Sequence, residues 1–388
     1  MSSPAAVCLR ESGWLIDLTR ALAGVESPST DREALEACAA VLSGRLAATG
    51  AAVSRLEAGA TAPHVLAEWP GEGPDVLLLG HYDTVWPVGQ LERMPIREVD
   101  GKLYGPGVYD MKAGLAIGAL AARAMVETLA VDRRPRVRLL ATADEEVGSA
   151  TSRAIIERLA RESAAVLVLE PALPGGRVKT ARKGVGEFAV TTRGISAHAG
   201  ADPAAGASAV HELARQIVAI EGLADPALGR SVNVGRVEGG TRSNVVAGSA
   251  TAIVDVRVSR LDDAPVVEAA FAALRPANPR VRLEISGGIN RPPMERTAGV
   301  GRLFDLARDA ARELGRELGE GATGGASDGN FTAALGIPTL DGLGAVGDGA
   351  HALHEHVVVS ALPGQAALVA ALLSRLVDNG IGSRLNHE

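Results

Sequence analysis

VLLLGHYDTV, residues 76 to 85, decides the fold, because four apolar residues run directly into Gly80, His81 and Asp83. An apolar run that ends at a glycine is typical of a strand buried on both faces. In open α/β sheets, ligands bind where such strands end. Residues two apart in extended chain point the same way, so Asp83 can hold one nitrogen of His81 while the other binds a metal. Alone, the stretch also fits a turn in which Asp83 caps His81 or Thr84.

The composition is that of an ordinary globular protein. The chain has 388 residues, 47% hydrophobic and 22% charged, which allows a large core and more than one domain. A net charge of −7 argues against a nucleic-acid partner, because phosphate binding needs clustered Lys and Arg. Cys8 and Cys38 lack metal-site spacing and predict free thiols in a reducing compartment. Without a signal peptide or an uninterrupted apolar run of about 18 residues, the sequence predicts a cytoplasmic protein with no membrane partner.

Strand and helix patterns alternate along the first half of the chain. This alternation predicts an α/β fold with a mostly parallel sheet and helices on both faces. The predicted strands are 51–56, 65–68, 76–79, a strand within 136–149 that ends in three consecutive carboxylates, and a strand within 164–172 closed by Glu170 and Pro171. The predicted helices are 11–22, 31–49, a segment ending near 129, and 152–160.

The pattern changes near Lys183 to the order βαββαβ, which resembles a ferredoxin-like module. Its predicted strands are 186–193, 231–238, 250–259 and 281–285, and its helices are 203–220 and 262–274. After Pro292-Pro293, helices return at 298–314, 330–335 and 363–377, with a short strand at 338–340. We therefore predict a catalytic domain of residues 1–182 and 293–388, interrupted by an inserted α+β domain of residues 183–292.

Five ligand-type side chains fall at or near the ends of predicted strands: His81, Asp110, Glu146, Glu170 and His351. Two imidazoles and three carboxylates suit Zn²⁺. They are too many for one structural ion, but about right for two ions that share a carboxylate and activate a water. Each motif alone also fits a simpler structure: a solvated acidic turn, a strand-end carboxylate, or an exposed polar loop.

Such a site also needs a base that does not bind metal, and Glu145 lies directly beside Glu146. Neighbouring side chains that leave an extended strand point to opposite sides, so one can face the metals and the other the water. Glu145 would accept the proton of the water and return it to the leaving amine. The run Asp144-Glu145-Glu146 also fits a helix cap.

The chain resembles the dinuclear zinc metallopeptidases that include glutamate carboxypeptidases, aminoacylases, succinyl-diaminopimelate desuccinylase and peptidase T. The resemblance covers nearly the whole chain and looks closest to the folate-hydrolysing glutamate carboxypeptidases. The motifs that carry it, in the order of the family, are GHYDTV, GPGVYDMKAG, ADEEVGS, LEPA, SAHAG, SNVVAG, DVR, GASDGNF and GAHALHEHV.

The resemblance implies two zinc ions per subunit, with Co²⁺ or Mn²⁺ as substitutes. His81 and Glu170 would bind one ion, Glu146 and His351 the other, and Asp110 would bridge them.

It also implies that Asp83 orients His81 and that Glu145 is the general base. The peptide bond from Asp110 to Met111 is expected to be cis.

In the inserted domain, the resemblance implies that His198 polarises the substrate carbonyl across a homodimer and that Asn244 and Arg257 hold the substrate carboxylate. His198 also fits an ordinary loop histidine, and Arg257 also fits a structural ion pair with Asp255. Domain crossings near residues 182 and 292 are expected to act as hinges that let this domain close as a lid.

The chain departs from the folate-hydrolysing pattern at two places. Arg177 stands where those enzymes carry a lysine for the glutamate side chain, and Arg291 stands at a matching arginine. The planar guanidinium of arginine presents several donors, whereas lysine presents one compact ammonium group, so the preferred acidic residue can differ. Where the family has Glu-Tyr after the ligand histidine, this chain has Glu355-His356, preceded by His354, which leaves solvated histidines or a third metal contact as alternatives.

We therefore expect a dizinc exopeptidase that releases a C-terminal glutamate or other acidic residue from a peptide or N-acyl compound. Two alternatives stay open: an N-acyl amino acid deacylase with the same metals, and a non-catalytic binding protein on this fold.

Overall fold

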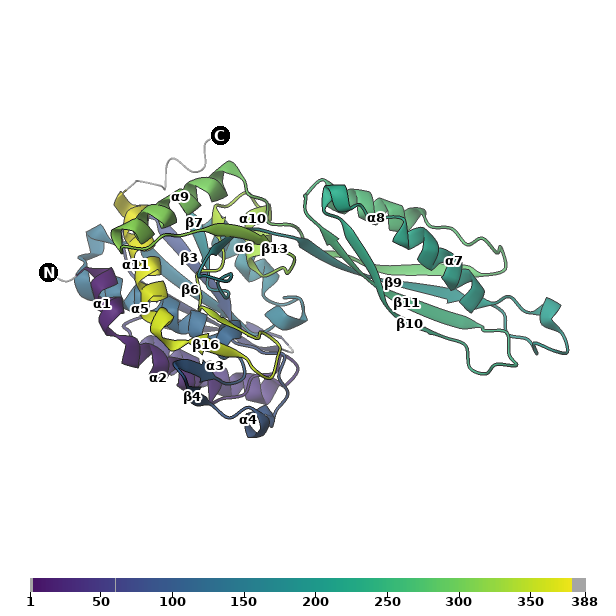
Figure 1. Ribbon diagram of the computed structural model, residues 1–388, viewed down its shortest axis with the longest axis horizontal. Helices are drawn as coiled ribbons and strands as arrows, with labels where there is room; N and C mark the ends of the chain where they lie inside the picture. Colours follow the sequence, from purple (N-terminus) through teal and green to yellow (C-terminus); the bar gives the residue numbers. More distant parts are fainter. Residues whose placement is uncertain (1–2, 60, 379–388) are drawn as a thin grey trace. The chain divides into compact units, whose positions relative to one another are not determined.

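The chain forms two compact units in the computed structural model, which describes residues 3–59 and 61–378 (Figure 1). One unit comprises Met1–Ala181, Arg296–Ala322 and Ser327–Glu388, and the other comprises Arg182–Glu295 with Thr323–Ala326. The sequence prediction placed the crossings after residues 182 and 292. Thr323–Ala326 joins the inserted unit because Arg182 donates to the carbonyls of Gly325 and Ala326, at 3.2 and 3.1 Å.

The catalytic unit is built on a six-stranded sheet in the order β1-β2-β6-β3-β7-β14. β3 is parallel to β6 and β7, and β14 is parallel to β7, whereas β1 and β2 are antiparallel. This arrangement confirms the predicted mostly parallel sheet. The strands are β1 (Ala52–Ala58), β2 (Thr61–Trp69), β3 (Asp75–His81), β6 (Arg136–Thr142), β7 (Ala165–Val168) and β14 (Thr339–Leu340).

Helices cover both faces of this sheet. Alternate residues of β3 serve the two sides: Val76 and Leu78 join the large core, while Leu77 and Leu79 pack in the smaller core. The large core is formed with α1 (Pro4–Arg10), α2 (Ser12–Ala23), α3 (Arg32–Ala47), α5 (Ala113–Thr128), α9 (Ala298–Glu313) and α11 (Leu362–Asp378). The smaller core is formed with α6 (Arg153–Arg161) and α10 (Gly329–Ala334).

Helix α5 approaches the end of β7 very closely. A Cβ atom at Gly114, in the first turn of α5, would overlap the carbonyl oxygen of Leu169. Only glycine permits this approach, because it has no side chain. The start of α5 is therefore held against the segment that carries Glu170.

Two small sheets were not predicted. The first has the order β15-β16-β5-β4, and the second pairs β13 with β8. The beginning of the segment 103–114 belongs to β5, which pairs with β16. This pairing brings the chain before Asp110 beside the chain after His351. The strands are β4 (Arg97–Val99), β5 (Lys102–Tyr104), β15 (Gly347–Asp348), β16 (His356–Val358), β8 (Val178–Arg182) and β13 (Glu320–Thr323).

The inserted unit has the predicted order βαββαβ. Its antiparallel sheet has the order β10-β11-β9-β12, and buried residues alternate with more exposed ones along β9 and β11. Helices α7 (Ala209–Glu221) and α8 (Asp263–Ala273) supply the rest of its core, where Phe271 stacks on Phe188 with ring centroids 3.8 Å apart. The strands are β9 (Gly184–Arg193), β10 (Ser231–Gly239), β11 (Ser249–Val258) and β12 (Arg282–Arg291).

Within the described residues, one helical stretch, Val359–Asp378, is long and apolar enough to cross a membrane. The core helix of a soluble protein passes the same test. Here the apolar residues of α11, from Leu362 to Leu376, are largely buried in the core of the catalytic unit.

Candidate metal centre

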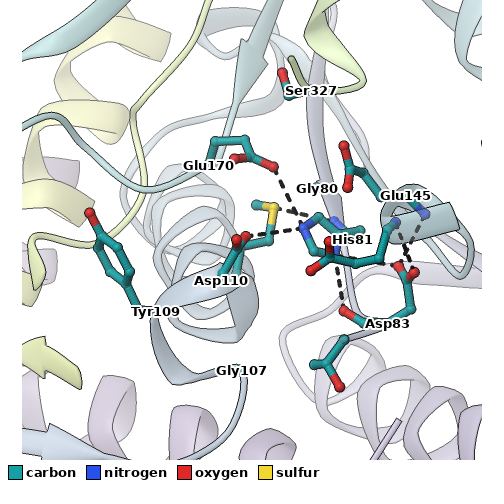
Figure 2. A network of polar contacts seen from close by, with 12 residues as sticks. Gly80, His81, Asp83, Gly107, Tyr109, Asp110, Glu145, Glu170 and Ser327 are labelled. Atoms are coloured by element: carbon teal, nitrogen blue, oxygen red, sulfur yellow. Dashed lines mark hydrogen bonds and ion pairs between the residues drawn. The ribbon is translucent and has the colours of Figure 1, made fainter. Parts of the chain in front are cut away.

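Four of the five predicted metal ligands lie at the carboxyl ends of the central parallel strands or in the turn before α5, and His351 lies between two strands of the small sheet. Figure 2 shows His81, Asp110 and Glu170 gathered together. His81 is the last residue of β3, and Glu170 follows β7 by two residues. Glu146 lies in a 3-10 turn just after β6, and Asp110 lies in the irregular turn Val108–Lys112. His351 lies between β15 and β16. The fold thus gathers ligands from five separate segments.

His81, Asp110 and Glu170 form one half of the cluster. The His81 Nε2 atom lies 3.3 Å from Asp110 Oδ1 and 3.5 Å from Glu170 Oε1. His81 is 1% exposed, so its ring is fixed by the surrounding protein.

His351, Asp110 and Glu146 form the other half. The His351 Nε2 atom lies 3.4 Å from Asp110 Oδ2 and 3.2 Å from Glu146 Oε1. The backbone of His351 has a φ of 59°, in the left-handed region that is uncommon for residues other than glycine and is found most often at functional sites. The two oxygens of Asp110 therefore face the two halves, one each.

These separations fit metal ligands. Two atoms that each lie about 2.0 to 2.2 Å from a tetrahedral ion are about 3.4 Å apart. The four N···O distances of 3.2 to 3.5 Å match this value. One ligand atom from each of His81, Asp110 and Glu146 also lies within 4.8 Å of the others. The imidazole nitrogens and carboxylate oxygens can thus hold a divalent metal.

The electrostatics of the cluster favour positive charge. Hydrogen bonds with Asp110 and Glu146 raise the pKa of His351 to about 10. Burial alone would lower the pKa of His81, but the surrounding carboxylates, first of all Asp110, outweigh burial and raise this pKa. Burial would raise the pKa of Asp110, yet the two imidazoles hold this pKa well below its usual range. A metal ion would replace the protons that these groups otherwise retain.

Asp83 contacts residues of both halves of the cluster, His81 in one half and Glu146 in the other. His81 Nδ1 lies 3.0 Å from the Asp83 carbonyl and 3.3 Å from Asp83 Oδ1. The same carboxylate accepts hydrogen bonds from the backbone amides of Glu145 and Glu146, both at 3.2 Å, and from the Ser29 hydroxyl at 2.7 Å. The sequence predicted the first contact. It did not predict the amide contacts, because every residue except proline has a backbone amide and the sequence does not indicate which amides donate.

Glu145 and Glu146 do not leave an extended strand, as the sequence argument assumed. They lie in the 3-10 turn Glu145–Val147, where the Gly148 amide donates to the Glu145 carbonyl at 3.0 Å. The turn forms because the Val147 and Ser149 amides both donate to the carbonyl of Asp144. Glu146 Oε1 nevertheless lies 3.2 Å from His351 Nε2. Glu145 is 8% exposed and lies beside His81 and Asp83 in Figure 2.

Two buried aspartates hold this turn in place: Asp144, which the sequence indicated only as a possible helix cap, and Asp328, which sequence reasoning missed. Asp144 accepts from the amide and hydroxyl of Thr151, both at 2.7 Å. Asp328 accepts from the hydroxyl of Ser149 and, at 3.1 Å, from that of Thr142. The quoted motifs ADEEVGS and GASDGNF contain both residues, so the motifs were the available signal.

The peptide bond between Asp110 and Met111 is cis, as the resemblance implied. Asp110 has a φ of −117° and a ψ of 93°, which interrupt the helical geometry of the turn. The neighbouring Tyr109 ring points away from the cluster (Figure 2).

The predicted substrate residues of the inserted unit fall in two groups. His198 and Asn244 lie on adjoining loops, where the Ala199 amide donates to the Asn244 carbonyl at 2.9 Å. The His198 ring is exposed, and its Nδ1 accepts from the amides of Gly200 and Ala201 at 3.2 and 3.0 Å.

Arg257 and Arg291 form the second group. Both pair in register with Val185, one from each neighbouring strand of β9, so their side chains lie on the same face of the sheet. Arg257 also makes the ion pair with Asp255 that the sequence left open, with a closest distance of 2.8 Å. Arg177 belongs to the catalytic unit, where it is exposed and its Nε donates to the Pro174 carbonyl at 3.2 Å.

His354 and His356 differ in exposure. His356 is buried, its Nδ1 lies 2.9 Å from the His354 carbonyl, and its ring packs against Tyr104 at 5.1 Å. His354 is exposed. The geometry of His356 is therefore that of a packed core residue.

Comparison with known proteins gives consistent matches. The profile of peptidase family M20/M25/M40 matches residues 77–375. Carboxypeptidase G2 of Pseudomonas sp. (strain RS-16) is 29% identical over 383 residues, which cover 96% of this chain and 91% of that protein. Succinyl-diaminopimelate desuccinylase of Xanthomonas oryzae pv. oryzae (strain MAFF 311018) is 30% identical over 378 residues, which cover 88% of this chain and 93% of that protein.

Solved structures share the fold. Aminopeptidase PepT of Bacillus cereus ATCC 10987 has a TM-score of 0.79 at 23% identity and covers 94% of this chain and 98% of its own. The Bacillus subtilis YXEP protein, described as a dinuclear metal binding peptidase from the M20 family, has a TM-score of 0.67 at 17% identity, covering 95% of this chain and 99% of its own. At these identities the structures establish the fold alone.

Proposed function

Because the chain belongs to peptidase family M20/M25/M40, we propose that it is a dizinc exopeptidase that releases a C-terminal amino acid, glutamate or another acidic residue, from a peptide or N-acyl compound. One observation carries this proposal. The carboxylate of Asp110 lies between two donor sets, with one oxygen toward His81 and the other toward His351.

Two zinc ions held by these residues would polarise the scissile carbonyl and lower the pKa of a bound water toward 7. Glu145 would accept a proton from the attacking water and return it to the nitrogen of the leaving amine. Its position in the turn beside Glu146, fixed by the amide contacts with Asp83, keeps it next to the ligands without making it one. Asp83 holds His81 in the tautomer that leaves Nε2 free to bind metal.

The cations of the chain support an acidic substrate. We propose that Asn244 and Arg257 hold the main-chain carboxylate of the released residue and that Arg291 or Arg177 contributes to its side-chain carboxylate. Arginine suits this role because its planar guanidinium binds carboxylates through two hydrogen bonds. We also propose a homodimer through the inserted unit, in which His198 of a second copy polarises the substrate carbonyl.

A release assay tests the proposal. Zinc-loaded protein is incubated with N-acyl and γ-glutamyl derivatives of glutamate, aspartate, leucine and lysine, and the free amino acid is measured. We expect release of the acidic residues, loss of activity with a chelator, and recovery with Zn²⁺. Failure to release glutamate or aspartate from any derivative would contradict the acidic specificity.

The second candidate is an N-acyl amino acid deacylase with the same residues. The similarity to a desuccinylase supports it, since that enzyme is 30% identical to this chain. A panel in which the amino acid is fixed and the acyl group varies from acetyl to succinyl and benzoyl separates the two. A preference set by the acyl group favours the deacylase, and no hydrolysis of any compound by metal-loaded protein favours a binding protein.

A further inference from the structure

Glu355 is a buried carboxylate whose two oxygens accept four hydrogen bonds. Its Oε1 accepts from the backbone amides of Tyr109 and Asp110, at 2.9 and 3.1 Å. Its Oε2 accepts from the amide of Gly107 at 3.0 Å and from the indole nitrogen of Trp86 at 2.8 Å. Only 1% of Glu355 is exposed, so these donors replace water completely.

These contacts join three segments that carry predicted metal ligands. Gly107 to Asp110 is the turn that presents the Asp110 carboxylate. Trp86 follows the stretch that contains His81 and Asp83, and Glu355 itself follows His351 by four residues. One carboxylate thus ties Asp110 to the chain on both sides of the cluster.

The turn needs such an acceptor because its first amides have no carbonyl partner within it. Tyr109 and Asp110 lie at the start of the segment Val108–Lys112, and the first amides of a helix have no preceding helical carbonyl to bind. A buried amide without a partner destabilises the fold, and a charged acceptor makes the strongest hydrogen bonds. Glu355 satisfies three amides of the turn at once.

We propose that Glu355 is a positioning residue for the metal centre, which fixes the Asp110 carboxylate between its two donor sets and links it to the segment of His351. The inference rests on the proposed metal site but on no substrate. Affinity for metal, and not only the stability of the fold, should therefore depend on Glu355. Residues that orient metal ligands typically change metal affinity or activity by about 10-fold to 100-fold when they are replaced.

The test is zinc binding by calorimetry to chelator-treated protein, with Glu355→Gln as the main variant. Glutamine keeps one acceptor oxygen but turns an NH₂ group toward N–H donors. We expect zinc affinity to fall by about 10-fold to 100-fold. Glu355→Asp keeps both acceptors on a shorter side chain and should recover part of this loss.

The chain offers a matched control in Glu212, a buried carboxylate of the inserted unit. Glu212 accepts from the amides of Ala277 and Asn278, at 2.8 and 3.0 Å, and from the side chain of Gln216 at 2.8 Å. Glu212→Gln should lower the melting temperature of the metal-free protein while leaving zinc affinity unchanged.

Trp86→Phe removes a single hydrogen-bond donor to Glu355. It replaces Glu355→Gln as the test variant if Glu355→Gln does not fold. We expect it to weaken zinc binding several-fold with little change in the melting temperature of the metal-free protein. The inference is overturned if folded Glu355→Gln or Trp86→Phe binds zinc as tightly as the parent, or if Glu212→Gln weakens zinc binding as much as Glu355→Gln. Because the assay contains no substrate, an error in the proposed substrate class leaves its result intact.

Discussion

The sheet of the catalytic unit and the sheet of the inserted unit use their faces differently. β3, β6 and β7 are buried on both faces along most of their length, and the predicted metal ligands lie at or just after their carboxyl ends. β9 and β11 bury only alternate residues, so the other face is open and carries Arg257 and Arg291. The fold thus separates a predicted set of metal ligands, of which His81 and Glu170 are buried and His351 is exposed, from the residues of the inserted sheet that we propose for substrate binding.

The difference extends to the histidines of the two units. His81 is buried and contacts three carboxylates, whereas His198 is exposed and held by two loop amides. Polar groups preorganised around the reacting atoms act on the chemical step, whereas arginines that hold a substrate carboxylate act on substrate binding. Substitutions in the catalytic unit should therefore change kcat or metal affinity, and those on the open face of the inserted sheet should change KM.

The largest effect is expected for Glu145→Gln. Removal of the general base should lower kcat by about 10²-fold to 10⁴-fold, with folding and zinc binding retained. The measurement is steady-state hydrolysis by zinc-loaded protein. The same exchange at Glu284, an inserted-unit residue paired with Arg193 at 3.3 Å, should leave kcat unchanged. Equal activity of Glu145→Gln and the parent would remove Glu145 from the mechanism.

A core truncation tests whether the inserted unit is supported separately from the metal centre. Phe271→Ala removes the ring stacked on Phe188 and should lower the free energy of unfolding of the inserted unit by about 3 to 5 kcal/mol. Zinc affinity should stay at the parent value. Urea unfolding and calorimetry measure the two quantities. A parallel loss of zinc affinity would show that the two units are not independent.

Arg257→Gln should act on substrate binding. A hydrogen bond from a charged donor contributes about 1.5 to 3 kcal/mol to binding. Its loss corresponds to a KM about 10-fold to 100-fold higher. The control is Arg236→Gln on β10, where an exposed arginine pairs with Glu238. A change in kcat alone for Arg257→Gln would place Arg257 with the chemistry instead of with recognition.

The smallest effect is expected for His64, which contacts the segment just before the 3-10 turn Glu145–Val147. His64 is fully buried, its Nδ1 accepts from the Ala143 amide at 3.1 Å, and burial lowers the pKa of this imidazole below 6.5. The neutral ring stabilises the fold fully above pH 6.5, and this contribution is lost as the pH falls through the lowered pKa, by at most about 1.4 kcal/mol per pH unit.

Urea unfolding of metal-free protein between pH 7 and pH 5 checks this expectation. The parent should lose more stability than His64→Gln over this range. Parallel curves for the two proteins would show that His64 does not titrate in this window.

Long, regular elements could be predicted from the sequence. The apolar run before Gly80 predicted β3, and Asp31 predicted the start of α3, where its side chain accepts from the Ala34 amide at 3.0 Å. Four of the five predicted ligands could be selected because each follows or borders such an element, whereas His351, between the short strands β15 and β16, was selected from its motif alone. Their residue types carry the chemistry, and the sheet brings strand ends together.

Short elements and backbone contacts could not be predicted. β5 and β16 have three residues each, too few to show the alternation of apolar and polar residues that predicts a strand. Each is stabilised by pairing with the other, which is distant in the sequence. The 3-10 turn of Glu145 depends on the carbonyl of Asp144, and the contacts of Glu355 depend on amides that every residue possesses. Three-dimensional proximity alone reveals these supports.

The close contact between α5 and Leu169 limits how this chain can vary. A methyl group at position 114 would displace the start of α5, and with it the turn that presents Asp110, away from Glu170. Directed evolution of a new substrate preference should therefore keep glycine at this position and place its diversity on the open face of the inserted sheet. A library built in this way changes what the enzyme recognises while the spacing of its metal ligands is inherited unchanged.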